Sequence, residues 1–212
     1  MFRDLLNNYF NQKITNAYSN NSKLFGYSPR ALFWNSSYNQ KKRFEELLNI
    51  IFDHTMNKKT SISDVGCGFG SMYEFIKKSD YDNFEYHGVD INEKFIKFCQ
   101  KKYPYVKFKV SNKPIHNINY SVMSGTYNYT LEKSIKLWES YIIYNLKQCW
   151  DLSNNGIVFN IQINCFPKIN NNIFYTSFEI MEELLIKNFG KVKSYKSKYF
   201  KKDAIFLIEK NN

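Results

Sequence analysis

The sequence predicts an α/β protein built on a doubly wound, seven-stranded, mostly parallel sheet with helices on both faces and an N-terminal helical extension. The first observation is the stretch 61–70, SISDVGCGFG, in which a β-favouring run ends in three alternating glycines before a helix from Ser71. The second is the run 84–90, FEYHGVD, a buried strand followed by a helix that Asn92 can cap. Together they form a βαβ unit, which requires parallel strands.

The remaining elements follow from apolar periodicity and from capping residues. Helical spacing predicts an amphipathic helix over 2–18 and a second helix that begins in a capping box of Ser37 and Gln40. Further strands are expected at 105–110, 120–124, 156–161, 191–200 and 203–209, with helices at 131–152 and 176–187, the latter capped by Thr176 and Glu179. The asparagine-rich loop 162–175 is predicted to be a flap on the substrate side.

Composition limits the class of protein. A chain of 212 residues can bury one core and is too short for two independent enzyme domains. The formal charge of +11 would allow a nucleic-acid partner, but the lysines are scattered, which favours a solvated basic surface. The four cysteines form no Cys-x-x-Cys pair, so neither a metal site nor a disulfide is predicted. No apolar run could span a bilayer, and we expect a cytoplasmic protein.

The glycine-rich turn and the end of the second strand carry the functional signal. Gly66 and Gly68 let the backbone approach a ligand, and no lysine follows to make a phosphate loop. An acidic residue at the position of Asp90 can accept hydrogen bonds from a ribose diol. The runs Asp64 to Gly70 and Gly88-Val89-Asp90-Ile91 resemble motifs of the class I S-adenosylmethionine-dependent methyltransferases.

This resemblance implies the strand order 3-2-1-4-5-7-6, with the seventh strand antiparallel between the fifth and the sixth. It also implies S-adenosylmethionine as cofactor, S-adenosylhomocysteine as product, and a helical lid over 1–58 packed on a core over 59–212. The expected cofactor-binding residues are Asp64, Gly66, Cys67, Gly68, Gly70, Asp90, Ile91, Asn112, Ser124 and Arg43. Arg43, in a pattern from Trp34 to Phe44 that resembles bacterial family members, would neutralise the methionyl carboxylate.

Two places depart from the family pattern. Many members carry an acidic residue after the third strand to hold the adenine amino group, whereas this chain has Ser111-Asn112, and we expect the amide oxygen of Asn112 to accept that hydrogen bond. The loop after the fourth strand, Gly125-Thr126-Tyr127-Asn128, lacks the Asn/Asp-Pro-Pro-Tyr/Phe signature of methyltransferases that act on adenine or glutamine amines. An amine acceptor is therefore disfavoured.

Substrate and catalytic candidates lie in the loops around the predicted site. The substrate-binding candidates are Tyr27, Trp34 and Asn128, and the catalytic candidates are Tyr127 and His116, the latter as a general base. The competing interpretation of each is an ordinary turn or core residue.

Our leading hypothesis is a methyltransferase that acts on a small polar acceptor, such as an oxygen of a sugar or metabolite. The net charge keeps a nucleic-acid methyltransferase as an alternative. A second alternative is a non-catalytic protein that keeps the fold and binds the cofactor, because an obvious base and the usual acid are missing. An NAD-dependent oxidoreductase is disfavoured by the glycine spacing.

Overall fold

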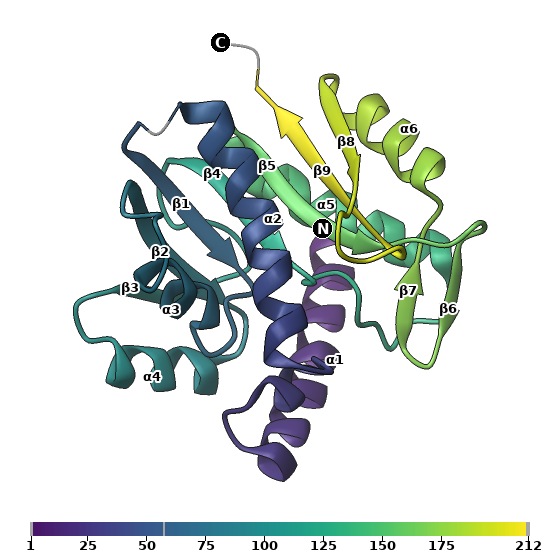
Figure 1. Cartoon of the computed structure of the whole chain (residues 1–212). Coiled ribbons are helices and arrows are strands. Elements are labelled where there is room, and N and C mark those ends of the chain that lie inside the picture. Colours follow the sequence, from purple (N-terminus) through teal and green to yellow (C-terminus); the bar gives the residue numbers. More distant parts are fainter. Residues whose placement is uncertain (1, 57, 211–212) are drawn as a thin grey trace.

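The computed structural model describes residues 2–56 and 58–210, and Figure 1 shows a central twisted sheet with helices in front of it and behind it. Residues 1 and 57 of the predicted N-terminal extension, and 211 and 212 of the predicted core, lie outside the described residues. The elements are α1 (Phe2–Phe25), η1 (Pro29–Leu32), α2 (Ser37–Thr55), β1 (Thr60–Val65), α3 (Ser71–Lys77), β2 (Phe84–Asp90), α4 (Glu93–Lys102), β3 (Lys107–Val110), β4 (Ile118–Ser124), α5 (Ile135–Leu152), β5 (Ser153–Gln162), β6 (Lys168–Asn170), β7 (Ile173–Tyr175), α6 (Phe178–Phe189), β8 (Val192–Lys196) and β9 (Asp203–Glu209).

The main sheet has the order β3-β2-β1-β4-β5-β9-β8. Strands β1 to β5 pair in parallel, and β9 pairs antiparallel with both β5 and β8. Strands β6 and β7 form a separate two-stranded sheet, so β8 and β9 are the sixth and seventh strands of the main sheet. Counted in this way, the predicted order with an antiparallel seventh strand is confirmed.

Each face of the sheet carries its own apolar core. On one face, α2, α3 and α4 bury side chains such as Leu47, Met72 and Ile96 against β1, β2 and β4. On the other, α1, α5 and α6 bury Phe10, Trp138 and Met181 against β5 and β9. Figure 1 shows α2 crossing in front of the sheet and α5 lying behind it. Because the central strands are covered on both faces, they bury apolar side chains that stabilise the fold and also a few polar ones, such as Ser63, Asp64 and Ser121.

Several predicted boundaries were wrong for local reasons. Helix α1 continues to Phe25 because no breaking residue precedes Gly26. Strand β3 begins at Lys107 rather than at residue 105, since the Tyr105 side chain is fully exposed and has no core to join. The helix expected from residue 131 begins at Ile135, where the Ser134 side chain caps it.

Two capping residues were assigned one position away from their true place. The side chain of Ser36, not Ser37, accepts the amide of Asn39 at the start of α2. Ser177, not Thr176, caps α6 by accepting the amide of Ile180. In both pairs adjacent hydroxyl residues compete for one capping position, and the sequence does not distinguish them.

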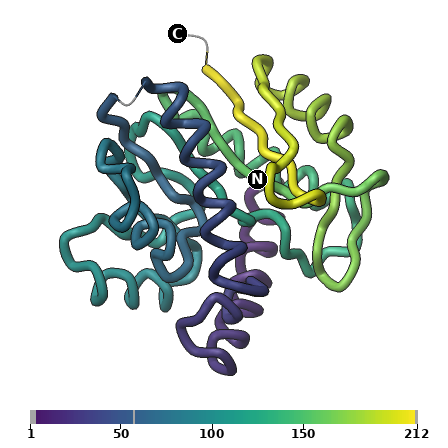
Figure 2. Tube along the Cα trace, viewed as in Figure 1, coloured from purple at the N-terminus to yellow at the C-terminus, as the bar shows by residue number. Residues whose placement is uncertain are grey.

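The predicted flap contains a hairpin that the sequence analysis missed. Strands β6 and β7 pair around Asn171 and Asn172, whose φ angles are 48° and 60°. Asparagine tolerates this left-handed conformation, which two-residue hairpin turns require. In Figure 2 the hairpin stands apart from the main sheet, in green.

The helices of the described chain include none that is both long enough and apolar enough to cross a membrane. The longest, α1, has 24 residues but carries asparagines along most of its length. Its buried contacts are therefore a mixture of apolar packing and side-chain hydrogen bonds.

Candidate active site

A cavity opens at the carboxyl ends of β1, β2 and β4, where ligands collect in doubly wound sheets. Helix α1 covers one side of it through Thr15 and Tyr18, and the segment 32–35 covers another. Ten of the residues that the sequence analysis singled out line this cavity: Trp34, Arg43, Gly66, Gly68, Asp90, Ile91, Asn112, Ser124, Tyr127 and Asn128.

The floor of the cavity is the turn from β1 into α3. Gly66 and Gly68 have φ angles of 84° and 55°, which favour glycine. The amides of Gly66 and Cys67 both donate to the carbonyl of Val89, which ties the turn to the end of β2. A methyl group added to Gly68 would lie 2.7 Å from Leu32 Cδ1, so glycine is also required for the close approach of segment 32–35.

Asp90 is held rigidly at the end of β2. Its Oδ2 accepts the Gly68 amide at 2.9 Å and its Oδ1 accepts the Asn92 amide at 2.8 Å. Burial raises the pKa of this carboxyl to about 6, and the two amide bonds work against that rise. Each oxygen keeps a further lone pair, and the residue lines the cavity. Asp90 can therefore accept two hydrogen bonds from a diol.

A chain of three side-chain amides runs from the cavity to α1. Asn145 Nδ2 donates to the carbonyl of Tyr141 and to Asn7 Oδ1, and Asn145 Oδ1 accepts from Asn112 Nδ2. A carbonyl can only accept, so the Tyr141 contact fixes which end of the Asn145 amide is the donor. Asn112 must then present its NH₂ to Asn145, and its own oxygen remains free as an acceptor for a ligand.

The far end of the cavity surrounds Gly125, at the carboxyl end of β4. Asn160 Oδ1 accepts the Gly125 amide at 2.8 Å, and Asn160 Nδ2 donates to Asp203 Oδ2. The hydroxyl of Ser124, beside them, is buried and has no hydrogen-bond partner among the described atoms. A buried polar atom of this kind that lines a cavity is a natural contact for a ligand.

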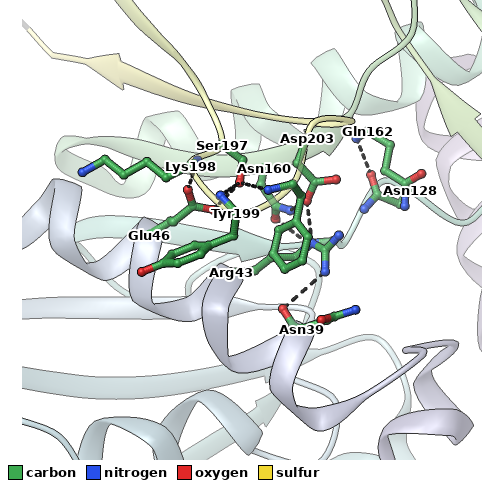
Figure 3. A network of polar contacts seen from close by, with 12 residues as sticks. Asn39, Arg43, Glu46, Asn128, Asn160, Gln162, Ser197, Lys198, Tyr199 and Asp203 are labelled. Atoms are coloured by element: carbon green, nitrogen blue, oxygen red, sulfur yellow. Dashed lines mark hydrogen bonds and ion pairs between the residues drawn. The ribbon is translucent and has the colours of Figure 1, made fainter.

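Arg43 closes this end from α2, as Figure 3 shows. Its Nε donates to Asp203, and its Nη1 donates to the carbonyl of Asn39. The guanidinium also lies between two rings, 5.2 Å from the centroid of Trp34 and 4.0 Å from that of Phe200. These contacts fix the side chain in one orientation and leave Nη2 without a partner in the part of the chain that the structure describes.

Aromatic rings form the outer wall. Phe33 and Tyr129 stack at a centroid distance of 4.4 Å and an interplanar angle of 6°, and Tyr18 meets both rings edge-on. Phe33 adopts a left-handed φ of 59° at the end of η1, which turns it into this cluster. The rings offer an apolar surface beside the polar groups around Gly125.

Three predicted cofactor residues do not line the cavity. Asp64 lies beneath the glycine turn, where it is buried and accepts the Tyr86 hydroxyl at 2.7 Å. Cys67 and Gly70 are also buried below the turn, so they shape it from inside. All three were predicted to bind the cofactor, but each is buried and none lines the cavity, so we assign them to support of the turn.

Two further candidates lie elsewhere on the molecule. Tyr27 is largely exposed and stacks on Phe98 at 3.9 Å, outside the cavity. His116 packs against His87, with ring centroids 4.7 Å apart, beside a separate small pocket. His116 immediately precedes β4 and so lies at the amino end of that strand, opposite the end where the cavity opens. The proposed base is thus in the wrong place.

Tyr127 reaches the cavity but is a core residue. Its ring packs against Tyr141 and Phe159, and its side chain is buried. Burial raises the pKa of this phenol well above its usual value. Tyr127 is therefore unsuited to accept a proton near neutral pH.

Sequence reasoning missed Asn145, Asn160 and Asp203. One signal was available for Asn145, which is an amide on the apolar stripe of a helix otherwise occupied by Trp138, Ile142 and Cys149. Nothing local marks Asp203, because its partner Arg43 is 160 positions away in the chain.

Comparison with known proteins defines the class of fold. No family model matches the chain. A methyltransferase from Leishmania major superposes with a TM-score of 0.66 at 11% identity, covering 91% of this chain and 82% of that one. The plantazolicin methyltransferase BpumL, in complex with S-adenosylhomocysteine and a substrate analogue, gives 0.59 at 15% identity, covering 95% and 98%. The chain therefore has the fold of the class I methyltransferases.

One curated relative matches in sequence. A candidate methyltransferase of Mycobacterium tuberculosis, Rv1506c, is 24% identical over 103 residues, which are 47% of this chain. The match spans 61% of the length of that relative.

Proposed function

We propose that the protein is an S-adenosylmethionine-dependent methyltransferase that acts on an oxygen of a small polar acceptor. The observation that carries this proposal is the bond from the Gly68 amide to Asp90, which joins the glycine turn to a buried carboxylate on the floor of one cavity. The fold supports it, since BpumL was solved with S-adenosylhomocysteine and a cyanobacterial methyltransferase of similar structure with S-adenosylmethionine.

The residues present fit this cofactor. Asp90 would hold the ribose diol, and the free oxygen of Asn112 would accept the adenine amino group beside Ile91. The methionyl end would lie over Gly66, where the unpartnered Ser124 hydroxyl meets a polar group. The cofactor supplies an electrophilic methyl group on a sulfonium.

The chain itself has to position the reactants and exclude water, because in-line displacement needs no covalent help from the protein. We propose that α1, within the extension 1–58, acts as the cover. Asn92 Nδ2 donates to Ser19 Oγ at 2.9 Å, and Tyr141 donates to Asn11 at 2.7 Å. These bonds dock the polar side of α1 over the cavity, while Phe10 anchors the same helix in the apolar core.

Isothermal titration calorimetry with S-adenosylmethionine and S-adenosylhomocysteine tests the cofactor. Micromolar binding of both is expected, and the absence of heat with either, for folded protein, would contradict the proposal. Conversion of S-adenosylmethionine to S-adenosylhomocysteine in the presence of a small-molecule extract separates an enzyme from a non-catalytic cofactor-binding protein.

Replacing Asn145 with alanine should weaken S-adenosylhomocysteine binding by about tenfold, because Asn112 then loses the partner that orients its amide. The lost affinity should come from the contact between Asn112 and the adenine amino group. Wild type should bind adenosine more tightly than purine riboside, which lacks that group, and the variant should bind the two alike. Asn7→Ala is the matched control, since it removes another partner of Asn145 but leaves the bond to Asn112. Retained discrimination in Asn145→Ala would refute the role of the amide chain.

A further inference from the structure

The cavity offers no residue suited to remove a proton from an acceptor. Among the described residues that line it, the ionisable side chains are Arg43, Asp90 and the tyrosines 18, 127, 129 and 141. Burial raises the pKa of each of these four phenols. Asp90 already accepts two backbone amides at the ribose position. An acceptor that must lose a proton, such as an alcohol, therefore finds no base here.

Two side-chain donors near Gly125 have no hydrogen-bond partner among the described residues, beside the Ser124 hydroxyl, which can donate or accept. Arg43 Nη2 is one, since Nε and Nη1 are occupied. Asn128 Nδ2 is another, because the Gln162 amide donates to Asn128 Oδ1 and thereby turns the NH₂ away from that strand. The nearby carboxylate, Asp203, is already bound by Arg43 and Asn160. Both free groups can donate to an oxygen of an acceptor, and Asp203, paired with Arg43, is not free to bind a cationic amine.

These donors converge on the loop that faces the methyl group. A methyl placed on Gly125 would lie 2.9 Å from Trp34 Cη2 and 3.5 Å from Asn128 Nδ2, and the Trp34 ring in turn lies over the Arg43 guanidinium. In Figure 3 the guanidinium lies below Asp203, and Asn128 and Gln162 lie to its upper right. The acid that anchors the guanidinium belongs to β9, which lies beyond β5 on the side of the sheet away from β1. We therefore assign Arg43 to the acceptor instead of the methionyl carboxylate.

Resting on the proposed function, we propose that the acceptor is a carboxylate on a molecule with an apolar, planar body. Arg43 Nη2 and Asn128 Nδ2 hold one carboxylate oxygen, and the other attacks the methyl carbon, while the stacked pair of Phe33 and Tyr129 lines one side of the body. An oxygen–carbon bond forms, the sulfur–carbon bond breaks and its electron pair stays on sulfur. The carboxylate charge and the sulfonium charge cancel, so no proton has to move. The product is a methyl ester.

The decisive measurement uses S-adenosylmethionine labelled in the methyl group and a small-molecule extract as the source of acceptors. Methyl esters release labelled methanol in dilute alkali, whereas methyl ethers and methylated amines do not. Labelled product that releases methanol supports a carboxylate acceptor. Labelled product stable to alkali would overturn the acceptor class and leave the methyltransferase intact, and no labelled product at all would count against the proposed function itself.

Two variants test whether Arg43 and Asn128 donate hydrogen bonds to the acceptor. Arg43→Gln combined with Asp203→Asn removes both charges together, so neither is left buried and unpaired. The rate of ester formation should fall by about 100-fold. The affinity for S-adenosylhomocysteine should stay within about threefold of the wild-type value. Asn128→Asp keeps the acceptor for the Gln162 amide but places a negative charge near the substrate, and transfer should fall by about tenfold or more. Equal losses of cofactor affinity and of transfer would place Arg43 at the cofactor and refute the assignment.

Discussion

Replacing Asp90 with alanine should weaken S-adenosylmethionine binding by about 100-fold or more, because two charge-assisted hydrogen bonds to the ribose are lost at once. The variant also removes the partner of the Gly68 amide, so the glycine turn loses its tie to the end of β2. Calorimetry on wild type and variant at matched protein concentration measures the effect. Binding within threefold of wild type would exclude the ribose role.

The asparagine variant sharpens this experiment. Both oxygens of Asp90 accept backbone amides, from Gly68 and Asn92, so an amide NH₂ on either side would face another donor. Asp90→Asn should therefore lose nearly as much affinity as Asp90→Ala, although it keeps the size of the side chain. Asn92→Ser is the control at the cap of α4, since serine can also accept the Lys94 amide and keeps the backbone amide that Asp90 accepts, although the variant loses the bond from Asn92 to Ser19 on α1. It should keep the ribose contact.

The sequence predicted the parts of the site that local rules determine. Gly66, Gly68 and Asp90 follow two neighbouring parallel strands, and the carboxyl ends of such strands meet at the same edge of the sheet. The bond between Gly68 and Asp90 is the consequence, although 22 positions separate them. Helix caps were predicted to within one residue because the hydroxyl side chains mark them directly.

The acceptor end was not predictable in the same way. Arg43 and Asp203 meet because α2 packs over β4 and β5, next to β9, and this long-range contact leaves no local pattern in either segment. Asn112 was assigned as an acceptor from the sequence, but its orientation depends on Asn145 in a distant helix. His116 was chosen for its residue type, although it precedes β4, and in a parallel sheet this places it at the amino end of the strand, opposite the edge where ligands bind.

Stability should fall as pH rises from 5 to 8, and Asp64 is the main cause. This residue is buried with one hydrogen-bond partner, the Tyr86 hydroxyl, and burial raises its pKa from 3.8 to about 7. Between those two values the folded protein keeps a proton that the unfolded chain has lost, so the free energy of unfolding decreases with rising pH. The slope is about 1.4 kcal/mol per pH unit for one such group. Asp90 adds to the slope below about pH 6, where its own pKa lies.

Urea unfolding at pH 5 and pH 8 should therefore differ by about 3 kcal/mol through Asp64 alone, with the protein more stable at pH 5. The neutral variant Asp64→Asn retains an oxygen for the Tyr86 hydroxyl and cannot ionise, so its unfolding free energy should change much less over the same range. Tyr86→Phe is the matched control, because it keeps the ionisable carboxyl and removes its one partner, which should make the pH dependence steeper. An identical pH dependence in wild type and Asp64→Asn would show that the carboxyl under the glycine turn is ionised in the folded protein. In that case the turn that carries Gly66 and Gly68 would not depend on a protonated Asp64.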